Sequence, residues 1–276
     1  MNRELFFSEL KRVSSLENFI HEESVFFFDE IESTNSYLHD TASKSQSNCS
    51  WMIAASDSQT KGRGRLQRKF YSPCGNGLYF SFCLEPSDGV KNPADYTVAS
   101  CVAVCRAIEK FFGKKDCKIK WVNDIYIGSK KVCGILTEGA MDASLSKVRS
   151  AIVGIGVNIF DDPALPEDLK EKVGSVTGCI SEKFKSYSVN EIREKFLAQI
   201  FAELLEIFES KENVIKEYKK RSNLIGRKLL VTPLIGNNES SYEATALDIT
   251  DDAGLVVELS DGSRKTLHTG EVTLSL

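Results

Sequence analysis

The stretch CKIKWVNDIYIGSKKVCGILTEG, residues 117–139, predicts a β-hairpin and with it a mixed sheet. Two runs rich in β-forming residues flank Gly128-Ser129, a pair suited to a two-residue turn. With that turn Tyr126 faces Lys131, so Asp124 and Lys131 share one face of the sheet, one diagonal step apart. Two interpretations are open. The pair is an exposed ion pair of about 0–1 kcal/mol, or a site where Lys131 neutralises developing negative charge while Asp124 positions a metal or an incoming amine.

The chain around this hairpin mixes strands with helices. The segment STN at 33–35 offers a helix cap, and Ser188 and Glu191 have the spacing of a capping box. Because strand and helix do not alternate strictly, we expect an α+β fold with a mixed sheet and not a doubly wound one. The expected strands are 25–30, 51–56, 78–84 and 151–159. One helix is expected to begin at 33–34, and three others to span 97–112, 188–209 and 211–221.

The pattern changes after Lys228 to short alternating strands separated by Gly, Asn and Asp turns. These strands are expected at 228–234, 242–249, 254–260, 264–268 and 271–275. A small β-barrel is therefore predicted at the C-terminus. The predicted domains are 1–222, with the mixed sheet, and 223–276, with the barrel.

A basic loop, QTKGRGRLQRKF at 59–70, directly follows a short apolar run. Gly62 and Gly64 allow positive φ values and close approach of the backbone to a ligand, and successive N–H groups in such a turn can hold an anion. Arg63 and Arg65 add planar donor groups for carboxylate or phosphate. A solvated basic loop is the alternative. GRGR also occurs in disordered nucleic-acid-binding tails, but here folded strands bound it.

A third stretch, GIGVNI at 154–159, is a buried strand interrupted by glycine. Glycine inside a strand marks close approach by a ligand or by backbone, and packing explains it equally well. The stretch lacks the third glycine and the following helix of a dinucleotide-binding fingerprint, so a Rossmann fold is excluded.

Composition limits the classes of function. With 39 acidic and 35 basic side chains the net charge is -4, so no overall charge favours nucleic acid or a membrane surface. The N-terminus lacks the features of a signal peptide, and no apolar run is long enough to cross a bilayer. We expect a cytoplasmic protein. None of the eight cysteines forms a C-x-x-C pair, so Cys101 and Cys105 are expected to pack in a core.

Four motifs, taken in order, resemble those of biotin protein ligases, also called biotin–[acetyl-CoA-carboxylase] ligases. They are ESTNSYL, QTKGRGRLQRKFYSP, IKWVNDIYIGSKKVCGILTE and VGIGVNI. The resemblance implies a biotin/lipoyl ligase fold, similar to class II synthetases, with an SH3-like C-terminal barrel. Only about 24 residues precede the first expected strand, too few for the winged helix-turn-helix of some members. A monofunctional ligase that does not bind DNA is therefore expected.

The resemblance also implies the chemistry. Biotin and MgATP would give biotinyl-5′-AMP and pyrophosphate, and a lysine of a biotin carboxyl carrier domain would then displace AMP. Carried over by motif, the catalytic residues are Lys131, Asp124 and Arg65, with Asp124 also a candidate Mg²⁺ ligand. The implied biotin ligands are Ser33, Thr34, Asn35, Gln59, Gly62, Arg63, Trp121, Lys131 and Gly134. The implied ATP or adenylate ligands are Arg63, Arg65, Phe70, Asn123 and Asn158.

Four residues depart from the family pattern. Val122 replaces the usual proline of the KWPND motif, Leu66-Gln67 replaces a basic-glycine pair, and Phe70 stands where a tryptophan usually stacks on adenine. A phenyl ring offers a smaller stacking face than an indole.

Other functions fit the sequence less well. A lipoate ligase would be expected to show an SGGG stretch with a nearby His-Asp, which the sequence lacks. A nucleic-acid-binding module conflicts with the acidic balance and the absence of interleaved aromatic residues. An inactive scaffold would not need Lys131, Asp124 and Arg65. The sequence leaves the carrier protein and the formation of a homodimer open.

Overall fold

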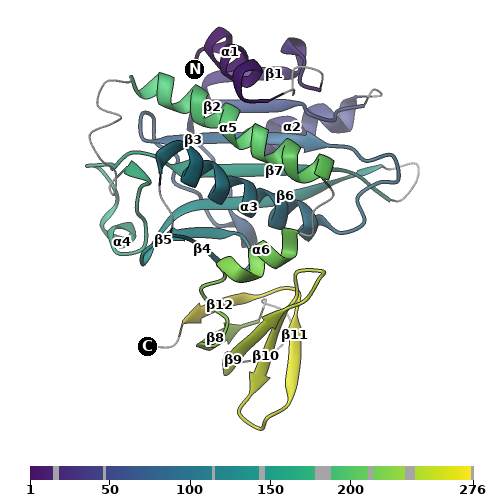
Figure 1. Ribbon diagram of the computed structural model, residues 1–276, viewed down its shortest axis with the longest axis vertical. Coiled ribbons are helices and arrows are strands. Elements are labelled where there is room, and N and C mark those ends of the chain that lie inside the picture. The colour runs from purple at the N-terminus through teal and green to yellow at the C-terminus, as the bar shows by residue number, and fades with distance from the viewer. Residues whose placement is uncertain are drawn as a thin grey trace.

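The computed structural model describes residues 1–14, 19–45, 48–113, 116–142, 147–177, 188–210, 214–233 and 240–274. Two sheets organise these residues, a seven-stranded one and a smaller five-stranded one (Figure 1). Within the described residues no helix is long and apolar enough to span a membrane.

The large sheet is mixed, as the sequence predicts. Its first two strands run parallel, and the other neighbours run antiparallel. In spatial order the strands are β1 (Val25–Ile31), β2 (Ile53–Gln59), β3 (Gly77–Leu84), β7 (Lys147–Asn158), β6 (Lys130–Asp142), β5 (Asp124–Ile127) and β4 (Cys117–Lys120). Strand β2 begins two residues later than predicted because Trp51 has a left-handed backbone, with φ of 63°.

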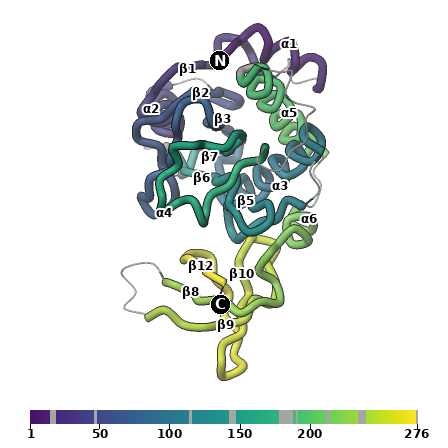
Figure 2. The backbone as a smooth tube through the Cα atoms, turned by 90° about the vertical axis from the view of Figure 1, so that its left-hand side faces the viewer, coloured from purple at the N-terminus to yellow at the C-terminus, as the bar shows by residue number. Residues whose placement is uncertain are grey.

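Helices cover both faces of this sheet (Figure 2). On one face lie α1 (Arg3–Val13), α3 (Pro93–Phe112) and α5 (Val189–Ser210), and on the other lies α2 (Thr34–Lys44). Shorter helices are α4 (Glu167–Lys170), α6 (Val214–Arg221) and the 3₁₀ turns Glu22–Ser24 and Arg65–Gln67. Helix α1 was not predicted from the sequence. Residues 211–213 of the expected helix 211–221 lie outside the described residues.

Helix α3 shows how local chemistry sets helix bounds. Asn92 accepts a hydrogen bond from the Ala94 N–H, and Pro93 fills the first turn, where no N–H partner is needed. The helix therefore begins four residues before the predicted start. Cys101 and Cys105 are fully buried in it, which confirms that they pack in the core.

Helix α5 follows the predicted capping box. The Glu191 carboxylate accepts from the Ser188 N–H at 2.8 Å, and Ser188 Oγ accepts from the Glu191 N–H at 3.2 Å. Further along, the buried Phe201 ring packs against Phe80 and Phe82 of β3, with ring centroids 5.7 Å apart in both pairs. The aromatic contacts attach this helix to the centre of the sheet.

The C-terminal strands, predicted to form a small β-barrel, form a separate five-stranded antiparallel sheet. Their order is β11 (Arg264–Leu267), β10 (Leu255–Leu259), β9 (Tyr242–Ile249), β8 (Lys228–Thr232) and β12 (Glu271–Leu274). Residues 234 and 275 of the predicted strands lie outside the described residues. The two sheets are joined by a buried contact in which Trp121 Nε1 donates to the Ala253 carbonyl at 2.7 Å. Next to the start of β12, the Gly270 carbonyl accepts a hydrogen bond from Arg65 at 3.3 Å.

Candidate active site

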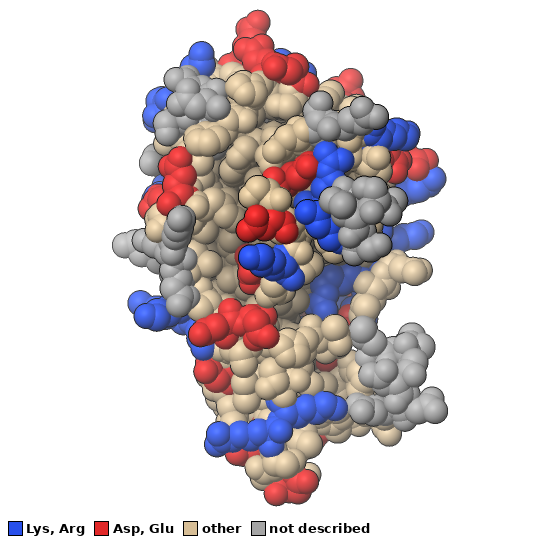
Figure 3. Space-filling view, turned by 90° about the vertical axis from the view of Figure 1, so that its right-hand side faces the viewer, with Lys and Arg blue, Asp and Glu red and all other residues tan. Residues whose placement is uncertain are grey.

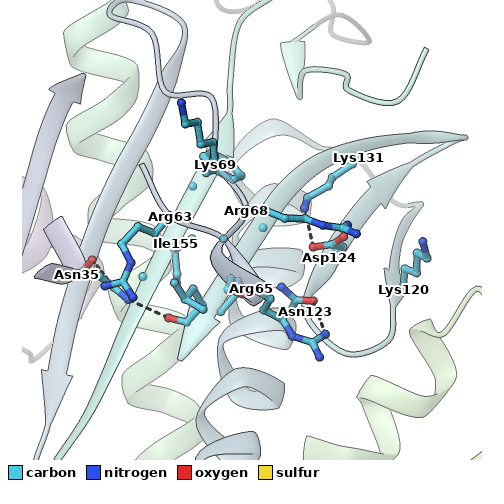
Figure 4. A pocket seen from close by; sticks show the side chains of 18 of the residues that line it. Asn35, Arg63, Arg65, Arg68, Lys69, Lys120, Asn123, Asp124, Lys131 and Ile155 are labelled. Atoms are coloured by element: carbon cyan, nitrogen blue, oxygen red, sulfur yellow. Dashed lines mark hydrogen bonds and ion pairs between the residues drawn. The ribbon is translucent and has the colours of Figure 1, made fainter. Parts of the chain in front are cut away.

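A cavity of about 230 Å³ lies on the sheet face that carries α2. Its wall is formed by the start of α2, the basic loop 59–70 and the middle of β6 and β7. Residues 270–273 of the small sheet complete the wall. Figure 4 shows the arginines of the basic loop, Lys131 and Asp124 gathered in this cavity.

The predicted pairing of Asp124 with Lys131 is present. Tyr126 faces Lys131 and Ile127 faces Lys130, as the Gly128-Ser129 turn requires. Lys131 Nζ lies 2.7 Å from Asp124 Oδ1, and the two side chains are 28% and 22% exposed. The approach lacks the direction of a hydrogen bond, so Oδ1 is buried with no hydrogen-bond partner among the described residues. It can still accept a proton or a hydrogen bond from an incoming group.

A β-bulge follows this pair and was not foreseen. The register shifts by one residue between Ile125 and Tyr126, so that Asp124 faces Gly134 and not Cys133. A bulge moves every later side chain of the strand to the opposite face. Gly134 and Leu136 therefore line the cavity, while Cys133 is buried in the main core.

The basic loop is folded back on itself. Gly64 N donates to the Arg68 carbonyl at 2.7 Å and Phe70 N to the Gly62 carbonyl at 2.9 Å. The expectation that its glycines take positive φ is wrong: φ is -119° at Gly64, and Gly62 is not among the glycines with positive φ. The positive values lie at Leu66 and Gln67, at 55° and 59°. Gly62 is required for a different reason: a Cβ atom there would lie 2.4 Å from the Phe70 carbonyl oxygen.

The cations of the basic loop have partners on three parts of the fold. Arg63 Nη2 lies 2.6 Å from Glu138 Oε1 on β6. Arg65 donates to Asn123 Oδ1 and to the Gly270 carbonyl, both at 3.3 Å. Arg68 forms an ion pair with Glu271 of the small sheet. Contacts of this kind hold the loop over the cavity in spite of its like charges.

The floor of the cavity is made of glycine. Gly134 and Gly156 face each other on β6 and β7, and the Phe70 ring lies directly on them. A Cβ atom at Gly156 would lie 2.4 Å from Phe70 Cε1, and one at Gly134 would lie 3.0 Å from Phe70 Cε2. Lys131 Nζ lies 5.9 Å from the centre of the same ring. The floor therefore accepts a flat group in close contact.

The start of α2 forms a polar end of the cavity. Ser33 caps the helix by accepting from the Ser36 N–H. Ser33, Thr34 and Asn35 are at most 4% exposed, and the Thr34 N–H donates to Gln59 Oε1 at 2.9 Å. Amide and hydroxyl groups without a net charge suit a neutral polar ligand at this end.

Most of the residues predicted from the sequence line the cavity. Gly62 and Asn158 do not: Gly62 supports the basic loop, and the Asn158 carbonyl accepts from the Val176 N–H. Trp121 lines the cavity, but its indole N–H donates to the Ala253 carbonyl and is not available to a ligand. Their roles in binding stay predictions.

Several lining or neighbouring groups were missed by sequence reasoning: Ser81, Lys120, Glu138 and Glu271. Lys120 stands first in the KWVND motif, which could have revealed it, and burial lowers the pKa of its ammonium. Among the described residues the lining carries six cationic side chains and two carboxylates. Anionic ligands are therefore favoured in this cavity. On the face seen in Figure 3, by contrast, acidic and basic side chains are interspersed.

A family model described as the biotin/lipoate A/B protein ligase family matches residues 27–158. This segment runs from β1 to the end of β7 and holds most of the cavity lining.

Known proteins resemble the chain in sequence and in fold. The bifunctional ligase/repressor BirA of Bacillus subtilis (strain 168) is 37% identical over 158 residues, 57% of this chain and 47% of that protein. The biotin–[acetyl-CoA-carboxylase] ligase of Paracoccus denitrificans is 33% identical over 118 residues, 42% of this chain and 47% of that protein. The chain spans about half the length of these curated relatives. Biotin protein ligase from Aquifex aeolicus, solved with biotin and ATP, has a TM-score of 0.69 at 27% identity and covers 91% of this chain and 98% of its own.

Proposed function

We propose that the chain is an ATP-dependent biotin protein ligase, because residues 27–158 match the biotin/lipoate A/B protein ligase family model and the chain resembles biotin protein ligases in sequence and fold. In the first half-reaction a carboxylate oxygen of biotin attacks the α-phosphorus of ATP, forming biotinyl-5′-AMP and releasing pyrophosphate. In the second, the ε-amine of a lysine attacks the acyl carbon, forms an amide and releases AMP. That lysine belongs to a biotin carboxyl carrier protein or domain of a biotin-dependent carboxylase such as acetyl-CoA carboxylase.

One observation carries this proposal: a neutral polar end and a strongly cationic end meet in a single cavity. Two anions, the biotin carboxylate and the α-phosphate, must approach each other in the first half-reaction, and cations beside them lower the barrier. Lys131 Nζ, next to the glycine floor, is the group we assign to bridge them. Arg65, held by Asn123 and Gly270, is assigned to the adenylate phosphate.

The remaining roles follow the two ends of the cavity. We assign Ser33, Thr34 and Gln59 to the ureido ring of biotin, since they offer hydroxyl and amide groups without charge. The other biotin contacts that we propose are Asn35, Gly62, Arg63, Trp121 and Gly134. For the nucleotide we propose Arg63, Phe70, Asn123 and Asn158.

Asp124 is assigned to the acceptor lysine. An ammonium must lose a proton before it can attack, and we assign the Asp124 carboxylate, which is ion-paired with Lys131 but has no hydrogen-bond donor on Oδ1 among the described residues, to assist that step. The same residue does not fit a resident Mg²⁺ site, because the Lys131 ammonium at 2.7 Å opposes a second cation there. Within the described ranges no three His, Cys, Asp or Glu side chains could hold a metal. We expect Mg²⁺ to arrive with the phosphates of ATP.

The proposal is tested by incubating the protein with ATP, radiolabelled biotin and a biotin carboxyl carrier domain. Label transfer to one lysine of the carrier, together with biotin-dependent ATP–pyrophosphate exchange, is the expected result. A protein that shifts nucleic acid in a salt-dependent way, with no such exchange, would refute it. We expect the reaction to take place in the cytoplasm, where ATP is available and cysteine side chains stay reduced.

A further inference from the structure

A chain of hydrogen bonds starts at Glu138 and runs along the polar end of the cavity to the far side of the basic loop. From Glu138 it passes through Asn35, Ser81, Thr34, Gln59 and Ser72 to the Phe70 carbonyl. Ser81, Thr34 and Asn35 are 0%, 3% and 4% exposed, so water does not replace their partners. The direction of each hydrogen bond therefore matters to a ligand.

Glu138 sets that direction together with the Leu136 carbonyl, because an ionised carboxylate and a backbone carbonyl only accept hydrogen bonds. Asn35 Nδ2 donates to both, and the contact with Glu138 is the shorter, at 2.9 Å against 3.3 Å. Asn35 must turn Nδ2 toward Glu138 Oε2, at 2.9 Å, which leaves Asn35 Oδ1 facing Ser81. An amide oxygen also only accepts, so Ser81 Oγ donates its single proton across the 2.6 Å contact. The proton in the 2.7 Å contact between Thr34 Oγ1 and Ser81 Oγ then comes from Thr34.

Thr34 Oγ1 consequently presents lone pairs to the cavity. It also lies 3.2 Å from Gln59 Oε1, but its one proton serves the shorter contact with Ser81. Gln59 is fixed as well, since Oε1 accepts from the Thr34 N–H and Nε2 donates to Ser72 Oγ at 3.1 Å. One amide hydrogen of Gln59 remains for a ligand. An acceptor beside a donor matches the N–H and C=O of a ureido ring.

We propose that Glu138 is a positioning residue that determines ligand specificity: its carboxylate orients Thr34 to accept a hydrogen bond from a ring N–H. This inference rests on the proposed function, which makes biotin the ligand. Glu138 touches no substrate in this arrangement and acts through Asn35 and Ser81. Its other oxygen, Oε1, is used by Arg63 at 2.6 Å, so both oxygens have donors.

The substitution Glu138→Gln should reverse the donor-to-acceptor direction of the hydrogen bonds from residue 138 to Thr34. The single oxygen of the new amide would turn to Arg63, whose guanidinium cannot accept a hydrogen bond, and its NH₂ group would face Asn35. Asn35 then turns over, against its weaker contact with the Leu136 carbonyl at 3.3 Å, and donates to Ser81. Ser81 donates to Thr34, and the Thr34 proton is released toward Gln59 Oε1 and the cavity. A ligand N–H would meet a donor in place of an acceptor.

The test measures equilibrium binding of biotin and of two lactam analogues, each with one ring N–H replaced by CH₂, by titration calorimetry. The wild type is expected to bind at least one lactam about a hundredfold more weakly than biotin, because a buried acceptor loses its partner. Glu138→Gln should reduce the ratio of the lactam Kd to the biotin Kd about tenfold or more. An unchanged ratio in Glu138→Gln would overturn the proposal.

Arg63→Met is the matched control. It breaks the ion pair with Glu138 but keeps the carboxylate and the direction of the hydrogen bonds. It should therefore weaken the binding of biotin and of the lactam equally and leave the ratio of their Kd values unchanged. A ratio that falls as far in Arg63→Met as in Glu138→Gln would show that only the ion pair matters, and the proposal would be wrong. If Glu138→Gln fails to fold, Ser81→Ala interrupts the same chain and should also shrink the ratio.

The outcomes separate this inference from the proposed function. A wild type that binds biotin but catalyses no exchange refutes the function and leaves the binding test intact. A wild type that binds neither biotin nor a lactam overturns both.

Discussion

Lys131→Ala should abolish most adenylate formation while leaving the fold in place. The ammonium lies 2.7 Å from Asp124 Oδ1 and 5.9 Å from the centre of the Phe70 ring, where the two reacting anions are proposed to meet. Its side chain is 28% exposed, so water screens its charge only in part. Two unit charges about 4 Å apart interact by about 4 kcal/mol at an effective dielectric constant of about 20.

The expected loss of rate follows from this geometry. Removing one preorganised group that stabilises transition-state charge costs about 10²–10³ in kcat, or about 3–4 kcal/mol. The arginines of the basic loop remain, so the loss should not exceed this range greatly. Unfolding should change by at most about 1 kcal/mol, because water can reach the partly exposed Asp124. That corresponds to a Tm shift of about 2–4 °C for a chain of this size.

Biotin-dependent ATP–pyrophosphate exchange measures the first half-reaction by itself, and a thermal melt measures the fold. Lys130→Ala is the matched control, since it removes a neighbouring cation whose Nζ donates to the Lys170 carbonyl outside the cavity. The control should exchange at the wild-type rate. Exchange in Lys131→Ala at the wild-type rate would contradict the bridging role, and a collapse of Tm would point to a structural role.

Three further perturbations test other parts of the site and the fold. Arg65→Gly removes the contacts to Asn123 and Gly270, so the adenylate should escape and label bystander lysines of an added protein; tight retention of the adenylate would contradict the assignment. Gly156→Ala brings a Cβ atom 2.4 Å from Phe70 Cε1 and should raise the KM for ATP; combined with Phe70→Ala the two effects should be less than additive, and strict additivity would refute the contact. Burial raises the pKa of the Glu194 carboxyl, so the folded protein binds more protons than the unfolded chain and the unfolding free energy falls as pH rises from the unfolded pKa through the folded one. Glu194→Gln should therefore raise Tm at pH 7 and flatten that slope in thermal melts, and an unchanged slope would be evidence against it.

Local features were readable from the sequence because they depend on near neighbours in the chain. The Gly128-Ser129 turn fixes which residues of the hairpin face each other, so the proximity of Asp124 and Lys131 could be predicted. The capping box at Ser188 and the burial of Cys101 followed from spacing in the same way. The earlier start of α3 at Pro93 was also readable, from the Asn92 cap that was overlooked.

The polar chain behind the cavity was decided by the tertiary structure alone. Strand period predicts that residues two apart share a face, which would carry Lys131, Cys133 and Ile135 to the same side. The bulge inserts one residue, so the pocket face continues through Gly134 and reaches Glu138 instead. Nothing in the spacing of the hairpin marks that extra residue.

The sequence by itself determined the mixed sheet, the separate C-terminal sheet and the cationic loop, because each is set by patterns within a few residues of each other. Contacts between distant segments were set only by folding: Arg68 meets Glu271, and Thr34 meets Ser81. The physical reason is that the energy of a buried polar contact depends on which groups the packed core brings within hydrogen-bond distance, and sequence separation does not encode that distance.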